Sequence, residues 1–394
     1  MPQRPLEGTE ITLLGAGVHE KLGGGARIGG LINILKDNGA KINLISFIPY
    51  SDKFRIEHKQ IDEQMCSSMI EFPAHWRRIY KEICVFWFNF YHTLRYSRSS
   101  DVVWASCSAV LSNLPSMLAA KLGRTPLIYD LLDIEVRVSE GLFQKAIAHS
   151  DAVFVCSHYL GEKAANCGNK NIYYMPCFVN LDRFRVDNKA REELRKEWGV
   201  NKDEIVIGYS GVLWVGEGVA VLLKALKMLL EKRDDVKVAV MGVNVPTNVM
   251  DDPAKIAKEL GIERNVLVIP PVTHERVPKF LSACDILCSP KIDNDVNRAT
   301  IAIKLVEYMA MGLPTVSSKI GQVSQIITPN YNGYLTIPGD ADNLSKTLSE
   351  IIENLPEARV VGKRGRDRIA EEFSDDVTSR NLVKSILEIT NKTK

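Results

Sequence analysis

Lys304 and Glu307 are the residues whose types and spacing point most directly to chemistry. They lie three residues apart in the otherwise apolar stretch TIAIKLVEYMAMGLPTVSS, residues 300–318, so on a helix they share one face. A charge in apolar surroundings is costly unless something pairs with it. A basic side chain beside a helix N-terminus is suited to bind an anion. The pair indicates either a polar, anionic ligand in a cleft or a surface ion pair worth roughly 0.2–0.5 kcal/mol.

The stretch that carries this pair has the features of a buried helix followed by a short strand. Thr300 has a hydroxyl that can cap a helix N-terminus, and apolar side chains then fill most of the helix circumference. Gly312 is expected to end the helix, and Pro314 prevents its continuation. The next residues, TVSS, are typical of a short buried strand. We therefore expect a helix from Thr300 to about residue 311, buried on more than one side.

LVEYMAMGLPTVSS resembles the donor-binding segment of the retaining GT-B glycosyltransferases of family four, the glycosyl transferases group 1. Their motif is a Glu, seven residues, a second Glu, and a helix that ends in Ala-x-Gly-x-Pro. In that family the second Glu holds the ribose hydroxyls of a nucleotide-sugar, and it falls here on Glu307. The first Glu falls on Ala299, which has no carboxylate. Some branches of the family combine this departure with a Lys at the position of Lys304.

A second segment, IGYSGVLWVGEGVAVLLKAL, is similar to the first strand, loop and helix of the family's donor domain. The family's glycines fall on Gly211 and Gly218. Glu217, however, stands where the family has the Lys that neutralises the diphosphate, and Val212 stands where it has an Arg. A cation must therefore come from elsewhere, and Lys304 is the first candidate for this catalytic role.

Three further residues complete the donor site that the resemblance implies. Arg298 is the second candidate for the cation. Thr300 and the amides of its helix N-terminus would face the phosphates. Val272, in the sequence Pro-Pro-Val, falls in the loop whose main chain receives the nucleotide base, although two prolines also mark an ordinary turn.

A glycine-rich stretch near the N-terminus is the candidate acceptor side. Gly24 and Gly25 precede an expected helix from about Ala26 to Asp37, and a glycine turn before a helix admits phosphate or sugar close to the backbone. The segment is similar to the family's first βα unit, whose Gly-Gly loop faces the acceptor. A loop that is merely flexible is equally consistent with the sequence.

Asp133 is a second candidate catalytic residue. It follows the apolar run LIYDLL, and acidic residues just after a buried strand sit where such folds place their chemistry. The family often has a His here that contacts the donor sugar, whereas this chain has Leu132. The alternative for Asp133 is the N-cap of a helix.

Residues 72–98, FPAHWRRIYKEICVFWFNFYHTLRYSR, combine aromatic and basic side chains. Basic ends around an aromatic middle suit a helix that lies on an anionic membrane surface. The alternative is a helix packed into the core of the first domain with a basic, solvated end. The aromatic residues cover more than one face, which weakens the amphipathic pattern.

The elements that must position these residues follow a βα alternation in both halves of the chain. Near-continuous apolar runs between helical stretches indicate parallel sheets covered on both faces, with ligands at the carboxyl ends of the strands. We expect a GT-B fold, that is, α/β with two Rossmann-like doubly wound domains facing a cleft. The expected boundaries are 1–182 and 183–373, with a C-terminal helix, 374–394, that returns to the first domain.

The bulk properties exclude several classes. A chain of 394 residues is long enough for two domains. A net charge of +2 gives no general attraction for nucleic acid. Eight cysteines in a chain of this size do not form a disulfide scaffold, and their spacing indicates no metal site. Without a signal-peptide core or a run of roughly 20 apolar residues, we expect a cytoplasmic protein. The aromatic and basic stretch 72–98 adds the alternative of a peripheral location at the cytoplasmic membrane face.

The resulting hypothesis is a retaining, metal-independent glycosyltransferase that needs no cofactor. Its donor would be a nucleotide-diphosphate sugar, and its acceptor a glycan or a lipid-linked sugar. The first alternative is an impaired relative that binds or scaffolds, because Ala299, Leu132 and Glu217 each remove a side chain that the family uses. The second alternative is a nucleotide-sugar epimerase on the same fold.

Overall fold

The chain divides into two units, each with its own sheet. The computed structural model describes residues 4–15, 23–106, 110–132, 140–243, 250–299 and 302–392. The described residues up to 15, the segment Gly24–Pro176 and the C-terminal segment from Asp376 form the first unit, and Gly23 and Cys177–Asp375 form the second. The boundaries thus fall a few residues from the expected 182/183 and 373/374.

The first unit is built on an eight-stranded sheet of order β3-β4-β2-β1-β5-β6-β7-β8. All neighbouring strands are parallel except β3 and β4, which form an antiparallel hairpin at one edge. The strands are β1 (Glu10–Gly15), β2 (Lys41–Ser51), β3 (Arg55–Asp62), β4 (Met65–Pro73), β5 (Val102–Ser106), β6 (Leu127–Leu131), β7 (Ala152–Val155) and β8 (Ile172–Tyr174).

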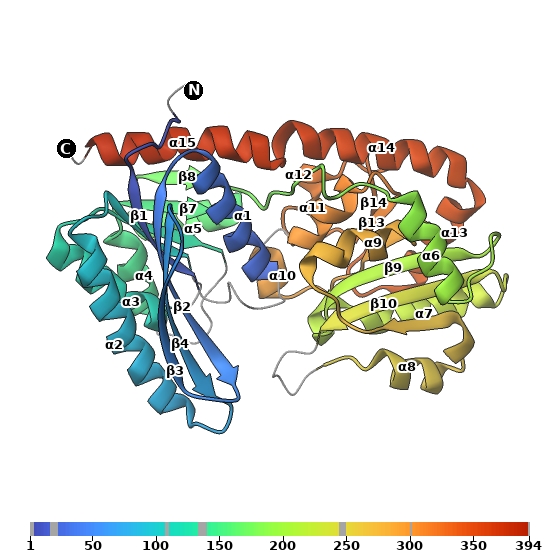
Figure 1. Cartoon of the computed structure of the whole chain (residues 1–394). Coiled ribbons are helices and arrows are strands. Elements are labelled where there is room, and N and C mark those ends of the chain that lie inside the picture. The colour runs from blue at the N-terminus through green and yellow to red at the C-terminus, as the bar shows by residue number, and fades with distance from the viewer. Residues whose placement is uncertain are drawn as a thin grey trace. The chain divides into compact units, whose positions relative to one another are not determined.

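Helices lie on both faces of this sheet, and the chain returns to it at its C-terminal end. They are α1 (Gly23–Asp37), α2 (Arg78–Ser97), α3 (Val110–Gly123), α4 (Glu140–Ala148), α5 (His158–Asn166) and α15 (Asp375–Lys392). Figure 1 shows α2, α3 and α4 beside one another along one face. On α15, Leu382 and Ile386 are buried, and Asn38 Nδ2 donates to Ser379 Oγ at 2.9 Å. The predicted return of the last helix is therefore correct.

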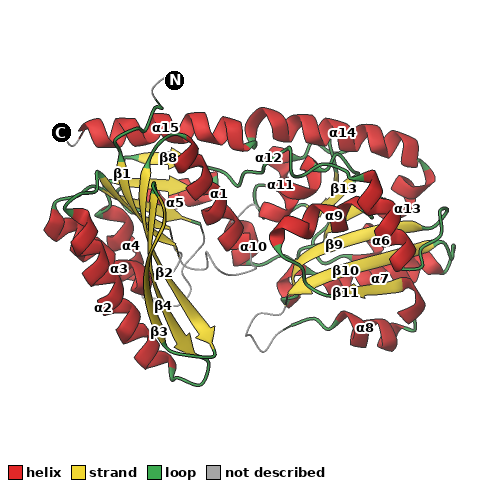
Figure 2. Ribbon diagram, in the orientation of Figure 1, coloured by secondary structure: helices red, strands yellow, loops and turns green. Residues whose placement is uncertain are grey.

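The second unit has a six-stranded parallel sheet of order β11-β10-β9-β12-β13-β14, drawn as one yellow layer in Figure 2. Its strands are β9 (Ile205–Val212), β10 (Val236–Val243), β11 (Val266–Ile269), β12 (Ile286–Ser289), β13 (Thr315–Ser318) and β14 (Tyr334–Thr336). The chain builds outward from β9 in one direction and then crosses back to β12. The carboxyl ends of β9 and β12 therefore flank the switch point where doubly wound sheets bind ligands.

Both faces of the second sheet are buried, which explains the near-continuous apolar strands of the sequence. On β9, Val206 belongs to the apolar cluster that includes α11, and the next residue, Ile207, belongs to the cluster that includes α7. The helices are α6 (Asn188–Glu197), α7 (Val219–Leu230), α8 (Pro253–Leu260), α9 (Val277–Ser282), α10 (Asp295–Ala299), α11 (Ile303–Ala310), α12 (Val323–Ile326), α13 (Ala341–Glu353) and α14 (Leu355–Glu372), with short 3₁₀ turns η1 (Val215–Glu217), η2 (Glu263–Asn265) and η3 (His274–Arg276).

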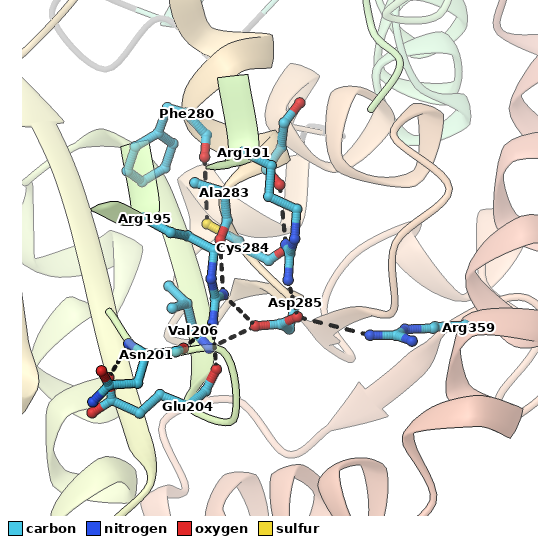
Figure 3. Close-up of polar contacts among 11 residues, drawn as sticks. Arg191, Arg195, Asn201, Glu204, Val206, Phe280, Ala283, Cys284, Asp285 and Arg359 are labelled. Atoms are coloured by element: carbon cyan, nitrogen blue, oxygen red, sulfur yellow. Dashed lines mark hydrogen bonds and ion pairs between the residues drawn. The ribbon is translucent and has the colours of Figure 1, made fainter. Parts of the chain in front are cut away.

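A buried carboxylate fixes α6 to the amino ends of β9 and β12. Asp285, 5% exposed, accepts from Arg191 Nη2 at 2.5 Å and from Arg195 Nη1 at 2.9 Å. It also accepts from the backbone N–H of Val206 at 2.9 Å. Figure 3 shows Asp285 between these donors, with Arg359 on its other side at 4.0 Å. The same two strands carry the candidate site at their opposite ends.

Candidate functional site

Two loops meet at the carboxyl ends of β9 and β12. The carbonyl of Gly216, after β9, accepts from Asn297 Nδ2 at 2.8 Å and from the N–H of Ile292 at 3.1 Å, both after β12. Gly218 has φ +77°, and a Cβ there would lie 1.9 Å from the carbonyl oxygen of Pro290. Only glycine allows this close approach. The loop after β9 is therefore held against the loop after β12.

Glu217 holds two lysines at once. Its Oε2 accepts from Lys304 Nζ at 2.8 Å, and its Oε1 accepts from Lys291 Nζ at 3.1 Å. The Glu217 side chain is 14% exposed and both lysine side chains are 11% exposed. Burial alone would raise the pKa of Glu217, but attraction and hydrogen bonding from the two ammonium groups outweigh it and lower that pKa to about 2. The three groups therefore carry a net charge of +1 at neutral pH.

Lys304 is fixed by more than this carboxylate. Its Nζ donates to Tyr209 Oη at 3.0 Å and lies 4.5 Å from the centroid of that ring, within the range of a cation–π contact. Tyr209 Oη donates to the carbonyl of Val212 at 2.5 Å. Burial, followed by the charge of Glu217, raises the pKa of Tyr209, so the phenol stays neutral.

Gly211 makes room for the Lys304 ammonium group. Its φ is +151°, and a Cβ there would lie 2.2 Å from Lys304 Nζ. Sequence comparison placed Gly211 in the donor site on family resemblance. The structure brings it to that site because its missing side chain admits the lysine over the end of β9.

Glu307 pairs with a histidine that sequence reasoning missed. Its Oε1 lies 2.5 Å from His274 Nε2, and Glu307 is 5% exposed while the His274 side chain is 28% exposed. His274 belongs to η3, which follows β11, and it also contacts Arg183. The imidazole therefore lies between solvent and a carboxylate on the same helix as Lys304.

The interpretation of Lys304 and Glu307 as a surface ion pair is wrong. The two side chains are largely buried, and each pairs with a residue from another segment. Lys304 pairs with Glu217, and Glu307 pairs with His274. Lys304 and Glu307 both belong to α11, so the predicted helix positions them on one side as expected. The site that they define contains two carboxylates and two ammonium groups.

The expected start of the helix at Thr300 is also wrong. The helix α11 begins at Ile303, and Ala302 is its N-cap, with φ −65° and ψ 130° and no side-chain cap. A separate short helix, α10, ends at Ala299. The extended backbone at Ala302 breaks the continuous helix that the apolar pattern predicted. Thr300 itself lies outside the described residues, and its donor role remains a prediction.

Arg298 is a poorer candidate for the phosphate cation than the sequence indicated. Its guanidinium donates to Asp293 Oδ1 at 2.7 Å and to Asp295 Oδ1 at 3.3 Å, and its side chain is 54% exposed. These carboxylates neutralise it locally. Lys291, two residues past the end of β12, is the better second cation. Its position after a buried strand was the sequence signal that could have found it.

The predicted donor-loop residue Val272 and the predicted acceptor-side glycines, Gly24 and Gly25, lie in the described part of the chain. Val272 is partly buried against the apolar cluster beside α11, in the segment between β11 and η3. Gly24 and Gly25 lie in the first turn of α1, which begins at Gly23 rather than at residue 26, so the expected loop at these glycines is wrong. In a helix interior, glycine is about 1 kcal/mol less favourable than alanine. These two glycines lie at the helix terminus instead.

Asp133 lies outside the described residues, and its catalytic role remains a prediction. The acidic residue of β6 itself, Asp130, is fully buried and serves the fold. Its Oδ1 lies 3.3 Å from Arg27 Nη2, and its Oδ2 accepts from Ser106 Oγ at 2.9 Å. Arg27 also donates to the carbonyls of Met175 and Pro176. Asp130 thus ties α1 to the ends of the strands.

Two further features concern metals and membranes. Within the described ranges, no three or more His, Cys, Asp or Glu side chains are grouped so that they could hold a metal ion. None of the helices in that part of the chain is long and apolar enough to cross a bilayer.

Comparison with known proteins places these findings in a family. Residues 190–368 match the family model described as "Glycosyl transferases group 1". The GDP-mannose-dependent alpha-(1-6)-phosphatidylinositol monomannoside mannosyltransferase of Mycobacterium tuberculosis is 22% identical over 237 residues, 59% of this chain and 60% of that protein. The chain spans only 51% to 60% of the length of the first curated relatives that it matches.

Two solved structures share the fold over nearly the whole chain. Sucrose-phosphate synthase from Thermosynechococcus elongatus has a TM-score of 0.81 at 15% identity and covers 98% of this chain and 100% of that one. Anabaena HepE in complex with UDP has a TM-score of 0.75 at 17% identity and covers 96% and 100%. The predicted GT-B fold and the family resemblance are both confirmed.

Proposed function

Since residues 190–368 match the family model of the glycosyl transferases group 1, we propose that this chain transfers a sugar from a nucleotide-diphosphate sugar to an acceptor hydroxyl. One observation carries the proposal. Two lysines, Lys291 and Lys304, converge on Glu217 at the carboxyl ends of β9 and β12, at the switch point of the sheet. A diphosphate is the ligand that such a pair of ammonium groups suits.

The chemistry needs positive charge at the leaving group. As the bond from the sugar to the diphosphate breaks, charge develops on the departing oxygen, and fixed cations stabilise it. Two of the three protons on Lys304 Nζ are directed at Glu217 and Tyr209, so the third can donate to a phosphate oxygen. The bond to the acceptor oxygen forms as the diphosphate takes the acceptor's proton. Because the lysines supply the charge, we expect no metal requirement.

Glu307 is proposed to hold the ribose hydroxyls of the donor. Its carboxylate lies on the same helix as Lys304 but is covered by His274. An ionised carboxylate accepts several hydrogen bonds, so a ribose can either share Glu307 with His274 or displace the imidazole. The proposed ribose site is therefore partly covered by an imidazole.

The acceptor and the membrane contact are further parts of the proposal. The mycobacterial relative is named for a phosphatidylinositol mannoside, and HepE was solved with UDP. On α2, Ile83, Trp87 and Tyr91 follow one another at four-residue spacing and are 51%, 62% and 60% exposed. Such a stripe with Arg77, Arg78, Arg95 and Arg98 at the helix ends suits contact with an anionic membrane. A lipid-linked or envelope glycan acceptor, a cytoplasmic location and retention of configuration complete the proposal.

A non-catalytic binding subunit is the second candidate, because one specific observation favours it. Glu217 halves the positive charge that the two lysines would otherwise present, and Ala299, at the position of the family's first Glu, is fully buried and brings no carboxylate. A site with these features can bind a nucleotide without driving its release.

The test is a panel of UDP-, GDP- and ADP-sugars, incubated with the protein and a membrane extract that supplies acceptors. We expect one donor to release its nucleotide, and we expect Glu307→Gln to weaken binding of that donor by about 1–3 kcal/mol. Lys258→Met, at an exposed position of α8, is the surface control. Binding without release favours the subunit alternative, and no binding of any donor contradicts both.

A further inference from the structure

A cavity of about 570 Å³ lies in the first unit between α3, α4 and the amino end of β6. Its walls are mainly apolar, from Leu114, Met117 and Leu118 on α3 and from Leu142 and Ala146 on α4. Because the amino ends of the strands face it, this cavity lies at the opposite end of the sheet from the edge where the fold binds its ligands.

Three basic side chains surround this apolar cavity. Lys121, Arg124 and Lys145 line it, and all three are exposed. Within the described chain, no ion pair joins any of them to a carboxylate. Asp151 also lines the cavity, and its Oδ2 accepts from the backbone N–H of Leu127 at 2.8 Å. The cavity therefore has an apolar interior and an edge of net positive charge.

The backbone at Arg124 has an ordinary structural cause. Its φ is +56°, in the left-handed region. The N–H of Arg124 donates to the carbonyl of Lys121 at 3.3 Å, and the N–H of Thr125 donates to the carbonyl of Ala120 at 3.0 Å, which is the hydrogen-bond pattern that ends many helices. Arg124 therefore lines the cavity at the turn from α3 into β6.

Helix capping offers a simpler account of the cations. Lys121 and Lys145 lie in the last turns of α3 and α4, where positive charge complements the helix dipole. That account leaves two features unexplained. It does not require an apolar cavity, and it does not require Leu118 in the cavity wall to be 45% exposed.

We propose that this cavity binds an anionic phospholipid of the membrane. An acyl chain would occupy the apolar interior, and the phosphate would lie among Lys121, Arg124 and Lys145. Charge complementarity favours this occupant, because three cations and the single carboxylate of Asp151 line the cavity, and a zwitterionic or uncharged amphiphile would leave their net positive charge uncompensated. The neighbouring helix α2 packs against α3 and carries the exposed stripe of Ile83, Trp87 and Tyr91. The proposal concerns the first unit alone and does not depend on the donor site.

Vesicle flotation tests the proposal with the full-length protein. Vesicles of phosphatidylcholine with about one third phosphatidylglycerol are compared with vesicles of phosphatidylcholine alone. We expect flotation with the anionic vesicles only, and a roughly five-fold or larger loss of partitioning for Lys121→Gln/Lys145→Gln. The control Lys59→Gln/Lys170→Gln removes two exposed charges elsewhere on the same unit and should bind as the wild type does.

A soluble ligand separates the cavity from general surface attraction. Calorimetric titration with dioctanoyl phosphatidylglycerol, below the concentration at which it forms micelles, should show one site. Glycerol 3-phosphate, which has the charge without the acyl chain, should bind far more weakly. Ala146→Phe fills the cavity from a buried position, and Leu118→Gln changes a half-exposed residue of the cavity wall, so we expect at least the second variant to keep the fold. Both should weaken lipid binding.

The proposal is overturned by any of three results. The first is equal binding of dioctanoyl phosphatidylglycerol and glycerol 3-phosphate, and the second is wild-type lipid binding by folded Ala146→Phe or Leu118→Gln. The third is loss of flotation in Trp87→Ser/Tyr91→Ser while the charge and cavity variants bind as the wild type. That last result would assign membrane contact to α2 alone.

Discussion

At the scale of single residues, Glu217 is the unexpected member of the site. The family resemblance requires a cation at its position, and the structure places two cations around it instead. The carboxylate separates two ammonium groups that would otherwise repel each other. Glu217 therefore fixes the positions of the two lysines, but it also lowers the net positive charge of the site.

Replacing Glu217 should lower stability and strengthen nucleotide binding. In Glu217→Gln the two largely buried ammonium groups lose their counter-charge, which costs up to about 3 kcal/mol of unfolding free energy. The site gains one positive charge, so a nucleoside diphosphate should raise the melting temperature of this variant more than that of the wild type. Thermal unfolding with and without the nucleotide measures both effects. An unchanged melting temperature in the absence of nucleotide would show that the ion pairs contribute nothing.

The same carboxylate predicts an acid-sensitive step in stability. The pKa of Glu217 is lowered from 4.5 to about 2 in the folded protein, so its contribution is complete above about pH 4.5 and is lost as the pH falls towards 2. The difference in unfolding free energy between wild type and Glu217→Gln should therefore shrink over that window. Urea titrations at pH 7, 4 and 3 measure it, and a constant difference would contradict the assignment.

At the scale of elements, the paired strands β9 and β12 have the Asp285 ion pairs at their amino ends and the lysine site at their carboxyl ends. Asp285 fixes the amino ends through α6 (Figure 3), while the loops at the carboxyl ends position the lysines. Removing one partner of a buried ion pair leaves an uncompensated charge and typically costs 3–5 kcal/mol, so about that loss is expected for Asp285→Ala.

The control for Asp285 is an arginine that touches it only weakly. Arg359 lies 4.0 Å away and its side chain is 57% exposed, so Arg359→Gln should change the unfolding free energy by less than about 1 kcal/mol. Chemical denaturation of both variants measures the contrast. If the two variants lost equal amounts of unfolding free energy, the distance and burial of these ion pairs would not determine how much they stabilise the protein.

The helix α2 of the first unit carries a second pH-dependent group. Burial, followed by the charges of His58 and Arg95, lowers the pKa of His92 from 6.5 to about 4. The unfolded chain thus binds a proton more readily between pH 6.5 and 4, and the first unit should lose stability as the pH falls through that window. His92→Phe should remove this component. Unfolding followed at pH 7 and pH 5 tests it, since an unchanged pH dependence in the variant would exclude His92 as its source.

At the scale of the whole molecule, the sequence predicted the fold well where the strands are buried on both faces. Apolar runs such as residues 205–209 and 315–317 are strands in the structure. The hairpin β3–β4 was missed because the side chains of β3 are mostly exposed, so no pattern of burial marked it. The polar helices α6 and α14 were missed for a similar reason, since few of their residues face the core.

The site was predictable only in part, because its key contacts join distant segments. The motif identified Lys304 and Glu307, but their partners Glu217 and His274 come from other loops. Those loops meet because β9, β11 and β12 are brought into one sheet, and spacing along the chain does not encode which side chains then touch. The Ala302 backbone, which breaks the helix, has no sequence signal either.

The central claim is that Lys291 and Lys304 bind the diphosphate of a nucleotide donor. The most direct test is the affinity of a nucleoside diphosphate relative to its monophosphate, measured by calorimetry for the base that binds best. In the wild type the diphosphate should bind more tightly, and in Lys291→Met/Lys304→Met that advantage should fall by about ten-fold or more, while Lys258→Met keeps it. An advantage that is unchanged in the double variant would contradict the account.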